Sequence, residues 1–452
     1  MLNEKEVLER GLEHIRRHEY DQAVVVLTRL IELSPKYADA YMSCGFACEE
    51  MGKFHQAIDY YSKVLLFAPN EPSAFFNRGR AYHRSGNLHQ AVSEYERAIH
   101  LKPDYAEAYF QRGRVSFSQG DLEKALQDYN KALEYAPDNP DIYTSRGLVY
   151  IAQKQIELAI KDYDTAIDRD PGHLKAHGNR GNALEMIGDI DNAIIEYNKV
   201  IELNDCDHKA YMNRGYIFFK MDRYEQALAD YNKAIELDPK NVKAFCSRGS
   251  VYAKLNNRKR ALEDYDQAIF LAPRNTEAYI RRGLVRLNLG DKTGALEDFN
   301  KAIELEPNNS KAWYNRGIIH SKLGEFEDAL DDYTEVIKRI PDDAPAYCYR
   351  GVVHTRLGNI QEALEDYDKA LKIDPGYSIA YYNRGLVMRF QGHFKQAVQD
   401  FTQAINLDPG YVPAFQNRSV TFSMIGDREQ AQRDMEQAEL MLQEGQSGKI
   451  KI

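Results

Sequence analysis

Apolar residues along the 452-residue chain recur at helical spacing, in paired blocks that are then repeated. In the segment 208–241, small or aromatic side chains stand at Tyr211 and Gly215 and again at Ala227 and Tyr231. A spacing of three or four residues places side chains on one face of an α-helix. The pattern therefore predicts two amphipathic helices in this segment, with a short turn between them.

Proline, glycine and alanine show how often the paired blocks repeat. Prolines stand 34 residues apart from Pro35 to Pro409, except that Asp205 takes one of the positions. Glycines keep the same interval from Gly11 to Gly385, and no insertion breaks the register. The regularity predicts thirteen units of 34 residues. These units start at residues 4, 38, 72, 106, 140, 174, 208, 242, 276, 310, 344, 378 and 412.

Each unit also carries signals that end its helices. Nine units have a glycine between the two helices, for example Gly86 and Gly120, where the first helix needs a left-handed C-terminal residue. The proline ends the second helix because it cannot donate the next hydrogen bond. One helix pair cannot bury its apolar stripe alone, so neighbouring pairs must stack. We therefore predict an all-α fold with a single solenoid over residues 4–445 and a short tail, 446–452.

The order of residue types within a unit resembles the tetratricopeptide repeat family. One unit shows its pattern of aromatic, glycine, aromatic, alanine, aromatic, alanine and proline in Phe75, Gly79, Tyr82, Ala91, Tyr95, Ala98 and Pro103. The resemblance implies a right-handed superhelical solenoid whose first helices line a concave groove that docks peptides and proteins. We interpret the chain as a protein–protein interaction scaffold or adaptor. The alternative is a regulatory or substrate-selecting subunit of an enzyme complex whose catalytic chain is separate.

Asparagine occupies the position two residues before the repeated glycine in six units. The six are Asn77, Asn179, Asn213, Asn315, Asn383 and Asn417. Here the sequence resembles the repeat domain of O-linked N-acetylglucosamine transferase, where such asparagines form a ladder along the groove. An amide can both donate to and accept from a peptide backbone. Each bond contributes only about 0.5–1.5 kcal/mol, so several must act together. The alternative is that these amides only cap helices or face solvent.

Other positions of the first helices face the same groove by analogy with the family. The apolar ones are Phe76, Phe110, Met212, Phe219, Tyr314 and Tyr382, and the basic ones include Lys175, Lys209, Lys243 and Lys311. An exposed apolar stripe flanked by lysines is typical of a protein-binding surface. It predicts a ligand with apolar and acidic residues. The alternative is that adjacent turns of the superhelix cover these side chains.

Arginine stands before the repeated glycine position in eleven successive units, from Arg78 to Arg418, where Ser419 replaces the glycine of the last unit. The same units carry an acid before the second-helix aromatic, from Glu94 to Asp434. One interpretation is a repeated ion pair between the helices, contributing about 0–1 kcal/mol each if exposed. The other is a stripe of arginines that binds acidic ligands. We favour the ion pair because each arginine is matched by an acid.

Composition narrows the function further. The net charge of −10 argues against nucleic acid as a partner, and no apolar run is long enough for membrane insertion. Five scattered cysteines and an N-terminus without an apolar signal core predict a cytoplasmic location. His320 and His354 occupy equivalent positions but lack a third ligand, so no metal is expected. We also expect no catalytic activity and no cofactor. The oligomeric state stays open.

Overall fold

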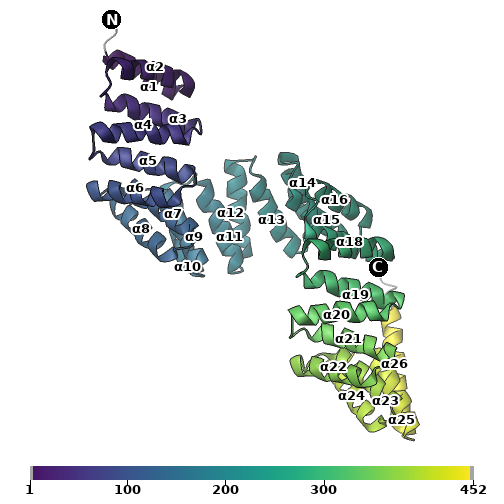
Figure 1. Ribbon diagram of the computed structural model, residues 1–452. Coiled ribbons are helices and arrows are strands. Elements are labelled where there is room, and N and C mark those ends of the chain that lie inside the picture. Colours follow the sequence, from purple (N-terminus) through teal and green to yellow (C-terminus); the bar gives the residue numbers. More distant parts are fainter. Residues whose placement is uncertain (1–3, 448–452) are drawn as a thin grey trace. The chain divides into compact units, whose positions relative to one another are not determined.

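The computed structural model describes residues 4–447, and this part of the chain is entirely helical and turn, without a strand. Contacts divide the chain into two compact units, Met1–Asp222 and Arg223–Ile452. Each unit is a row of antiparallel helix pairs in which every helix packs on its neighbours in sequence (Figure 1). The predicted all-α repeat solenoid is therefore confirmed. Its right-handed superhelix and its extent as a single domain stay predictions.

The first unit contains helices α1 to α13. Their bounds are α1 Glu4–Arg16, α2 Tyr20–Leu33, α3 Ala38–Glu50, α4 Phe54–Phe67, α5 Pro72–Arg84, α6 Leu88–Leu101, α7 Ala106–Ser118, α8 Leu122–Tyr135, α9 Pro140–Ala152, α10 Ile156–Arg169, α11 Leu174–Met186, α12 Ile190–Leu203 and α13 His208–Lys220.

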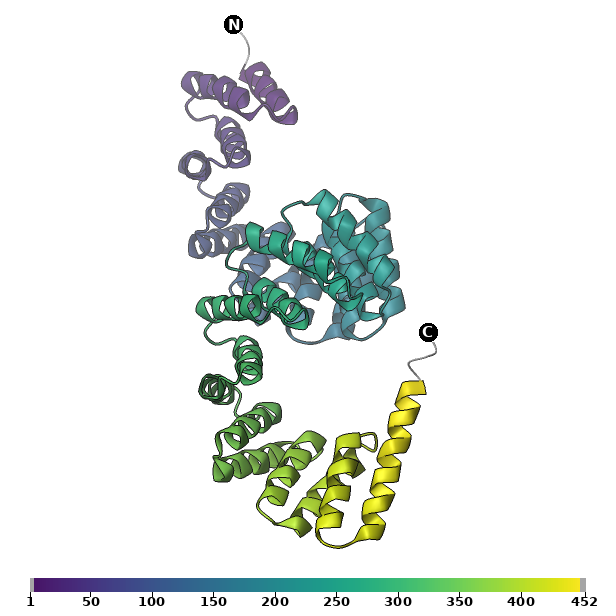
Figure 2. The same cartoon turned by 90° about the vertical axis from the view of Figure 1, so that its right-hand side faces the viewer.

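The second unit contains helices α14 to α26. Their bounds are α14 Tyr224–Leu237, α15 Val242–Lys254, α16 Arg258–Leu271, α17 Thr276–Asn288, α18 Lys292–Leu305, α19 Ser310–Leu323, α20 Phe326–Arg339, α21 Ala344–Leu357, α22 Ile360–Ile373, α23 Ser378–Phe390, α24 Phe394–Leu407, α25 Val412–Met424 and α26 Arg428–Ser447. The longer α26 stands out at the C-terminal end in Figure 2. It includes the first two residues of the predicted tail, and the rest of that tail lies outside the described residues.

A glycine lets the two helices of a pair come close together. A Cβ atom placed on Gly147 would lie 2.4 Å from Cε1 of Tyr163, and one on Gly113 would lie 2.7 Å from Cε1 of Tyr129. Any side chain larger than hydrogen would therefore push the ring away. The tyrosine rings at this position are fully buried and form the centre of their helix pairs, and Leu27, Phe299 and Phe401 take the same place in three other pairs.

The turn between the helices of a pair requires a left-handed residue. Nine glycines with positive φ fill this position among the described residues, as predicted from the sequence. The same position holds four residues that are not glycine, namely His18, Lys154, Asp222 and Asn256, each with φ near 60°. A side chain disfavours this conformation, and asparagine and aspartate tolerate it best. The backbone at Lys154 and His18 is therefore strained.

The second helix of a pair ends before the proline, as the sequence predicts. In α6 the last residue is Leu101, and Lys102 adopts an extended conformation with φ −133° and ψ 88°. Pro103 follows, and a residue before proline is forced away from the helical region by the proline ring.

The predicted arginine–acid pairs are present and are more deeply buried than the sequence indicated. Arg248 donates through Nε and Nη2 to both carboxylate oxygens of Asp264 at 2.9 and 2.6 Å, and its Nη1 donates to Asn232 of the preceding pair at 2.7 Å. Its guanidinium also lies 5.6 Å from the ring centre of Phe245. Burial raises the pKa of Asp264, although Arg248 acts in the opposite direction.

The same arrangement recurs in both units. The pairs are Arg78–Glu94, Arg112–Asp128, Arg146–Asp162, Arg180–Glu196, Arg248–Asp264, Arg282–Asp298, Arg316–Asp332, Arg350–Asp366, Arg384–Asp400 and Arg418–Asp434. The estimate of about 0–1 kcal/mol for exposed pairs therefore does not apply, since in Arg316–Asp332 the acid is only 1% exposed. Removing one partner of such a buried pair costs about 3–5 kcal/mol. These guanidinium groups are occupied, so the structure does not support an arginine stripe that binds acidic ligands.

The two histidines singled out in the sequence belong to the same network. Nδ1 of His320 lies 2.9 Å from Asp332, and Nε2 of His354 lies 3.9 Å from Asp366. Each histidine thus contacts the acid of its own helix pair. Between residues 4 and 447 the structure shows no cluster of three or more potential metal ligands. No helix in this range is long and apolar enough to cross a membrane.

The turn at Lys154 allows a direct test of whether a non-glycine residue at this left-handed position is strained. Replacing Lys154 by glycine should raise the free energy of unfolding in urea by about 0.5–1 kcal/mol, because glycine accepts positive φ without a steric penalty. Asn256→Gly is the matched control and should give a smaller gain, since asparagine already tolerates this conformation. An equal or negative effect of Lys154→Gly would mean that the turn stores no strain.

Candidate functional site

A pocket in the first unit gathers several of the residues predicted to bind peptides. It has a volume of about 400 Å³ and opens among α9, α11, α12 and α13. We call it the asparagine pocket. Its lining residues are Leu148, Leu174, Lys175, Gly178, Asn179, Asn182, Tyr197, Val200, Asp207, Lys209, Ala210 and Asn213.

Asn182 is the hydrogen-bonding centre of the pocket. Its Oδ1 accepts a hydrogen bond from the Tyr197 hydroxyl at 2.7 Å and another from Nδ2 of Asn213 at 3.1 Å. Burial raises the pKa of Tyr197 well above the usual range of a phenol, so this hydroxyl stays protonated and acts as a donor. Asn182 therefore orients Asn213 and ties α11 to both α12 and α13.

The amide of Asn179 is available for a ligand. Its side chain is half-buried in the pocket and forms no hydrogen bond with any other described residue. Asn213 uses one N–H on Asn182, and its carbonyl oxygen accepts no hydrogen bond from within the described chain. Donors and acceptors thus remain unused in one small pocket.

Two lysines give the pocket a positive charge. Lys209 is exposed at the start of α13, and its ammonium group makes no ion pair with the described residues. Lys175 lies 3.8 Å from Asp141 and is 78% exposed. The acid that lines the pocket, Asp207, is engaged as a helix cap, because its carboxylate accepts from the backbone N–H groups of Lys209 and Ala210 at 2.9 and 3.2 Å.

The remaining predicted asparagines lie elsewhere, and their amides already bond to other residues of the chain. Nδ2 of Asn315 donates to the Lys311 carbonyl at 2.7 Å, and Asn383 and Asn417 likewise donate to the carbonyl four residues earlier. Asn77, in the first unit, lies 3.3 Å from the sulfur of Met42. In Asn315, Asn383 and Asn417 the amide thus bonds to the preceding turn of its own helix. Only Asn179 and Asn213 are brought together in one pocket.

The predicted exposed apolar stripe is partly wrong. Phe76, Phe110 and Met212 are only 6%, 8% and 6% exposed. The ring of Phe76 packs 5.9 Å from Tyr95 of its own pair and 5.0 Å from Tyr105, which precedes the next pair. Tyr105 therefore covers Phe76, as the alternative held.

The other predicted groove residues are more accessible. Phe219, Tyr314 and Tyr382 are half-buried, and Lys243 and Lys311 are exposed. Their role in binding stays a prediction.

Asn182 was not predicted as a site residue, although the sequence carried a signal for it. It is the single asparagine found directly after the repeated glycine in any unit. The sequence alone could not assign a role to Asn182, because its hydrogen-bond partner Tyr197 lies 15 residues away on another helix.

Family models describe most of the chain. Models described as TPR repeat and tetratricopeptide repeat match residues 79–117, 113–154 and 215–256, residues 8–74, 144–207 and 246–310, residues 310–343 and 344–377, and residues 378–411. The chain belongs to the tetratricopeptide repeat family. The matches end at residue 411, before α25 and α26, so the count of thirteen tetratricopeptide repeats stays a prediction.

Solved structures of tetratricopeptide repeat proteins resemble parts of the chain. YrrB, described as a TPR protein with an unusual peptide-binding site, is 30% identical and covers 41% of this chain and 95% of its own, with a TM-score of 0.35. MamA is 23% identical and covers 36% of this chain and 96% of its own, with a TM-score of 0.34.

The Cut9–Hcn1 hetero-tetramer of APC/C provides a match over more of the chain. It is 12% identical and covers 98% of this chain and 94% of its own, with a TM-score of 0.48. No curated protein sequence matches the chain. The repeats themselves identify a protein-interaction scaffold.

The hydrogen bonds of the pocket separate a structural asparagine from an available one. Asn182→Ala should lower the free energy of unfolding by about 1–3 kcal/mol, because the buried Tyr197 hydroxyl loses its acceptor. Asn179→Ala should change it by no more than about 0.5 kcal/mol, because the Asn179 amide has no partner to lose. Urea unfolding of the two variants measures both values, and equal losses would contradict the assignment.

Proposed function

We propose that the chain is a scaffold that binds extended peptide segments of partner proteins in the asparagine pocket. The observation that carries this proposal is the unused amide of Asn179, which lies beside Asn213 and two lysines in a single pocket. The pocket has no cluster of acid, base and nucleophile, so its chemistry supports binding.

The chemistry of the pocket favours a peptide backbone. An asparagine amide presents an N–H donor and a carbonyl acceptor, which match the carbonyl and N–H of an extended chain. Such contacts do not depend on the ligand's side chains, so they hold a peptide without reading its sequence. Lys175 and Lys209 add a preference for acidic side chains, and Leu148 and Leu174 add apolar surface.

The expected affinity follows from the number of contacts. A few hydrogen bonds of about 0.5–1.5 kcal/mol each, together with exposed charge pairs of about 0–1 kcal/mol, allow a dissociation constant on the order of micromolar or weaker. A natural partner would therefore need a second contact elsewhere on the scaffold, or a high local concentration, to be held firmly.

A peptide-display selection against the full chain tests the proposal. We expect the wild-type protein to enrich extended peptides with acidic and apolar residues, and an Asn179→Ala/Asn213→Ala variant to lose at least tenfold in affinity for them. Asn315→Ala is the matched control, because Asn315 has the same position in its repeat but bonds to its own helix. It should bind like the wild type.

A charge reversal makes the same experiment more specific. Lys175→Glu/Lys209→Glu should shift the selected peptides from acidic to basic residues, since both ammonium groups point to solvent at the pocket. All variants must first show wild-type helicity and melting. If the selected peptides are the same for every variant, the asparagine pocket is not the binding site.

A further inference from the structure

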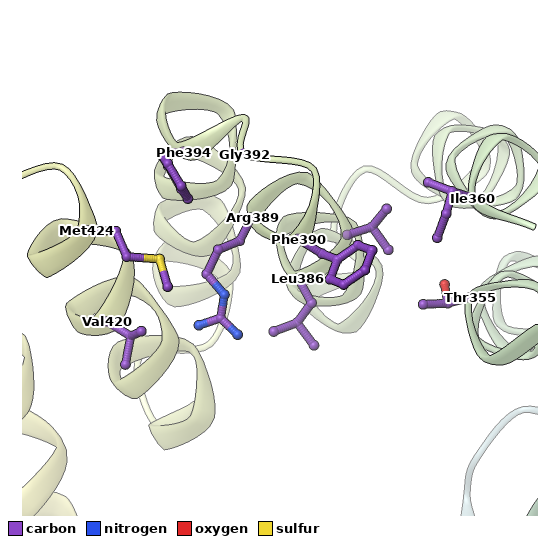
Figure 3. A pocket seen from close by; sticks show the side chains of 10 residues that line it. Thr355, Ile360, Leu386, Arg389, Phe390, Gly392, Phe394, Val420 and Met424 are labelled. Atoms are coloured by element: carbon purple, nitrogen blue, oxygen red, sulfur yellow. The ribbon is translucent and has the colours of Figure 1, made fainter. Parts of the chain in front are cut away.

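The second unit contains another pocket, with different chemistry. It has a volume of about 680 Å³ and opens among α21, α22, α23, α24 and α25 (Figure 3). We call it the Arg389 pocket. Its lining residues are Thr355, Ile360, Leu386, Val387, Arg389, Phe390, Gly392, Phe394, Val420 and Met424.

The apolar residues of this pocket depart from the repeat. Phe390 and Met424 are the last residues of α23 and α25, and they are 82% and 57% exposed. Six earlier first helices carry a cation at the same position, namely Arg16, Arg84, Lys220, Lys254, Lys322 and Arg356. The buried core does not require Phe390 or Met424, because both side chains face solvent. Their exposure is typical of a surface that binds another molecule.

Arg389 places one positive charge in this apolar surface. Figure 3 shows its guanidinium between the side chains of Leu386 on one side and Val420 and Met424 on the other. No acid lines the pocket, and Arg389 makes no ion pair or side-chain hydrogen bond with the described residues. Its charge reaches Tyr382, where it lowers the pKa while burial, the larger effect, raises it.

This arginine differs from those that hold the repeats together. Arg384, on the same helix, donates to Asp400 at 2.9 and 2.6 Å and to Asp368, so each of its three guanidinium nitrogens is engaged. Arg389 keeps all five of its N–H donors available next to apolar side chains. A guanidinium in such a place, partly shielded from water, favours a planar carboxylate that accepts two parallel hydrogen bonds.

We propose that the Arg389 pocket docks a partner segment in which a bulky apolar side chain stands next to an aspartate or glutamate. The carboxylate pairs with Arg389, and the apolar side chain packs between Phe390 and Met424. The charge complementarity selects this occupant, since the pocket offers one unpaired cation and no anion. The volume suits a few side chains of a peptide. The proposal concerns other residues and another unit than the asparagine pocket, so it goes beyond the proposed function.

Random 12-residue peptides displayed against the full chain provide the test. The best Phe- or Leu-containing acidic peptide is synthesised with a fluorescent label, and its dissociation constant is measured by polarisation. We expect Arg389→Gln to weaken it at least tenfold and Met424→Lys to weaken it at least fivefold. Arg356→Gln, an exposed arginine outside the pocket, is the matched control and should have no effect.

Paired substitutions in the protein and in the peptide test whether Arg389 contacts the peptide's carboxylate. Replacing the peptide's Asp or Glu by the corresponding amide should weaken binding to the wild type at least tenfold but have little effect on binding to Arg389→Gln. Arg389→Glu should instead select peptides with lysine or arginine beside the apolar residue. We expect the fold to be retained, because Arg389 has no ion pair or side-chain hydrogen bond with the described residues to lose, and matching melting curves verify this.

Three results would overturn the proposal. One is a selected set without acidic residues, and another is a set whose binding ignores Arg389. The third is a concentration-dependent dimer in sedimentation that Arg389→Gln abolishes, since a second copy would then be the occupant. The Asn179→Ala/Asn213→Ala variant keeps this test apart from the proposed function: peptides of the Arg389 pocket bind it unchanged, even if the asparagine pocket binds nothing.

Discussion

The close contact between a glycine on the first helix and an aromatic ring on the second sets the geometry of most helix pairs. A Cβ atom on Gly147 or Gly113 would lie within 2.8 Å of the opposing tyrosine ring, far inside van der Waals contact. Because the helices approach this closely, the ring fills the whole space between them and is shielded from water. The faces left over are apolar and too large for one pair to bury, so each pair needs a neighbour.

The arginine–acid pairs then determine how neighbours meet. Arg248 binds both oxygens of the acid in its own pair, and its third nitrogen reaches the preceding pair. A buried ion pair is weak evidence for stability, because desolvation offsets the attraction. Its geometry is nevertheless specific, since two parallel hydrogen bonds tolerate little rotation. The pairs therefore fix the register of stacking more than they add to the free energy of folding.

The sequence predicted the features that depend on local chemistry. Positive φ at Gly86 and the end of α6 before Pro103 follow from single residues, and the pairing of Arg248 with Asp264 follows from their constant spacing. The sequence did not predict features that depend on contacts between one repeat and the next. Phe76 was expected to be exposed, but Tyr105 from the following turn covers it. The contacts of Asn182 depend in the same way on helices that the repeat pattern alone does not position.

From the third unit onward, each predicted unit carries its own arginine and its own acid, and this has a consequence for how such a chain evolves and how it is synthesised. Deleting or duplicating a whole 34-residue unit between two repeats removes or adds both charges together, so no buried ion is left alone. Gain or loss of such a repeat in evolution therefore leaves the buried charges of the remaining units matched. During synthesis on the ribosome, likewise, the arginine and the acid of one such unit both emerge before the next unit does.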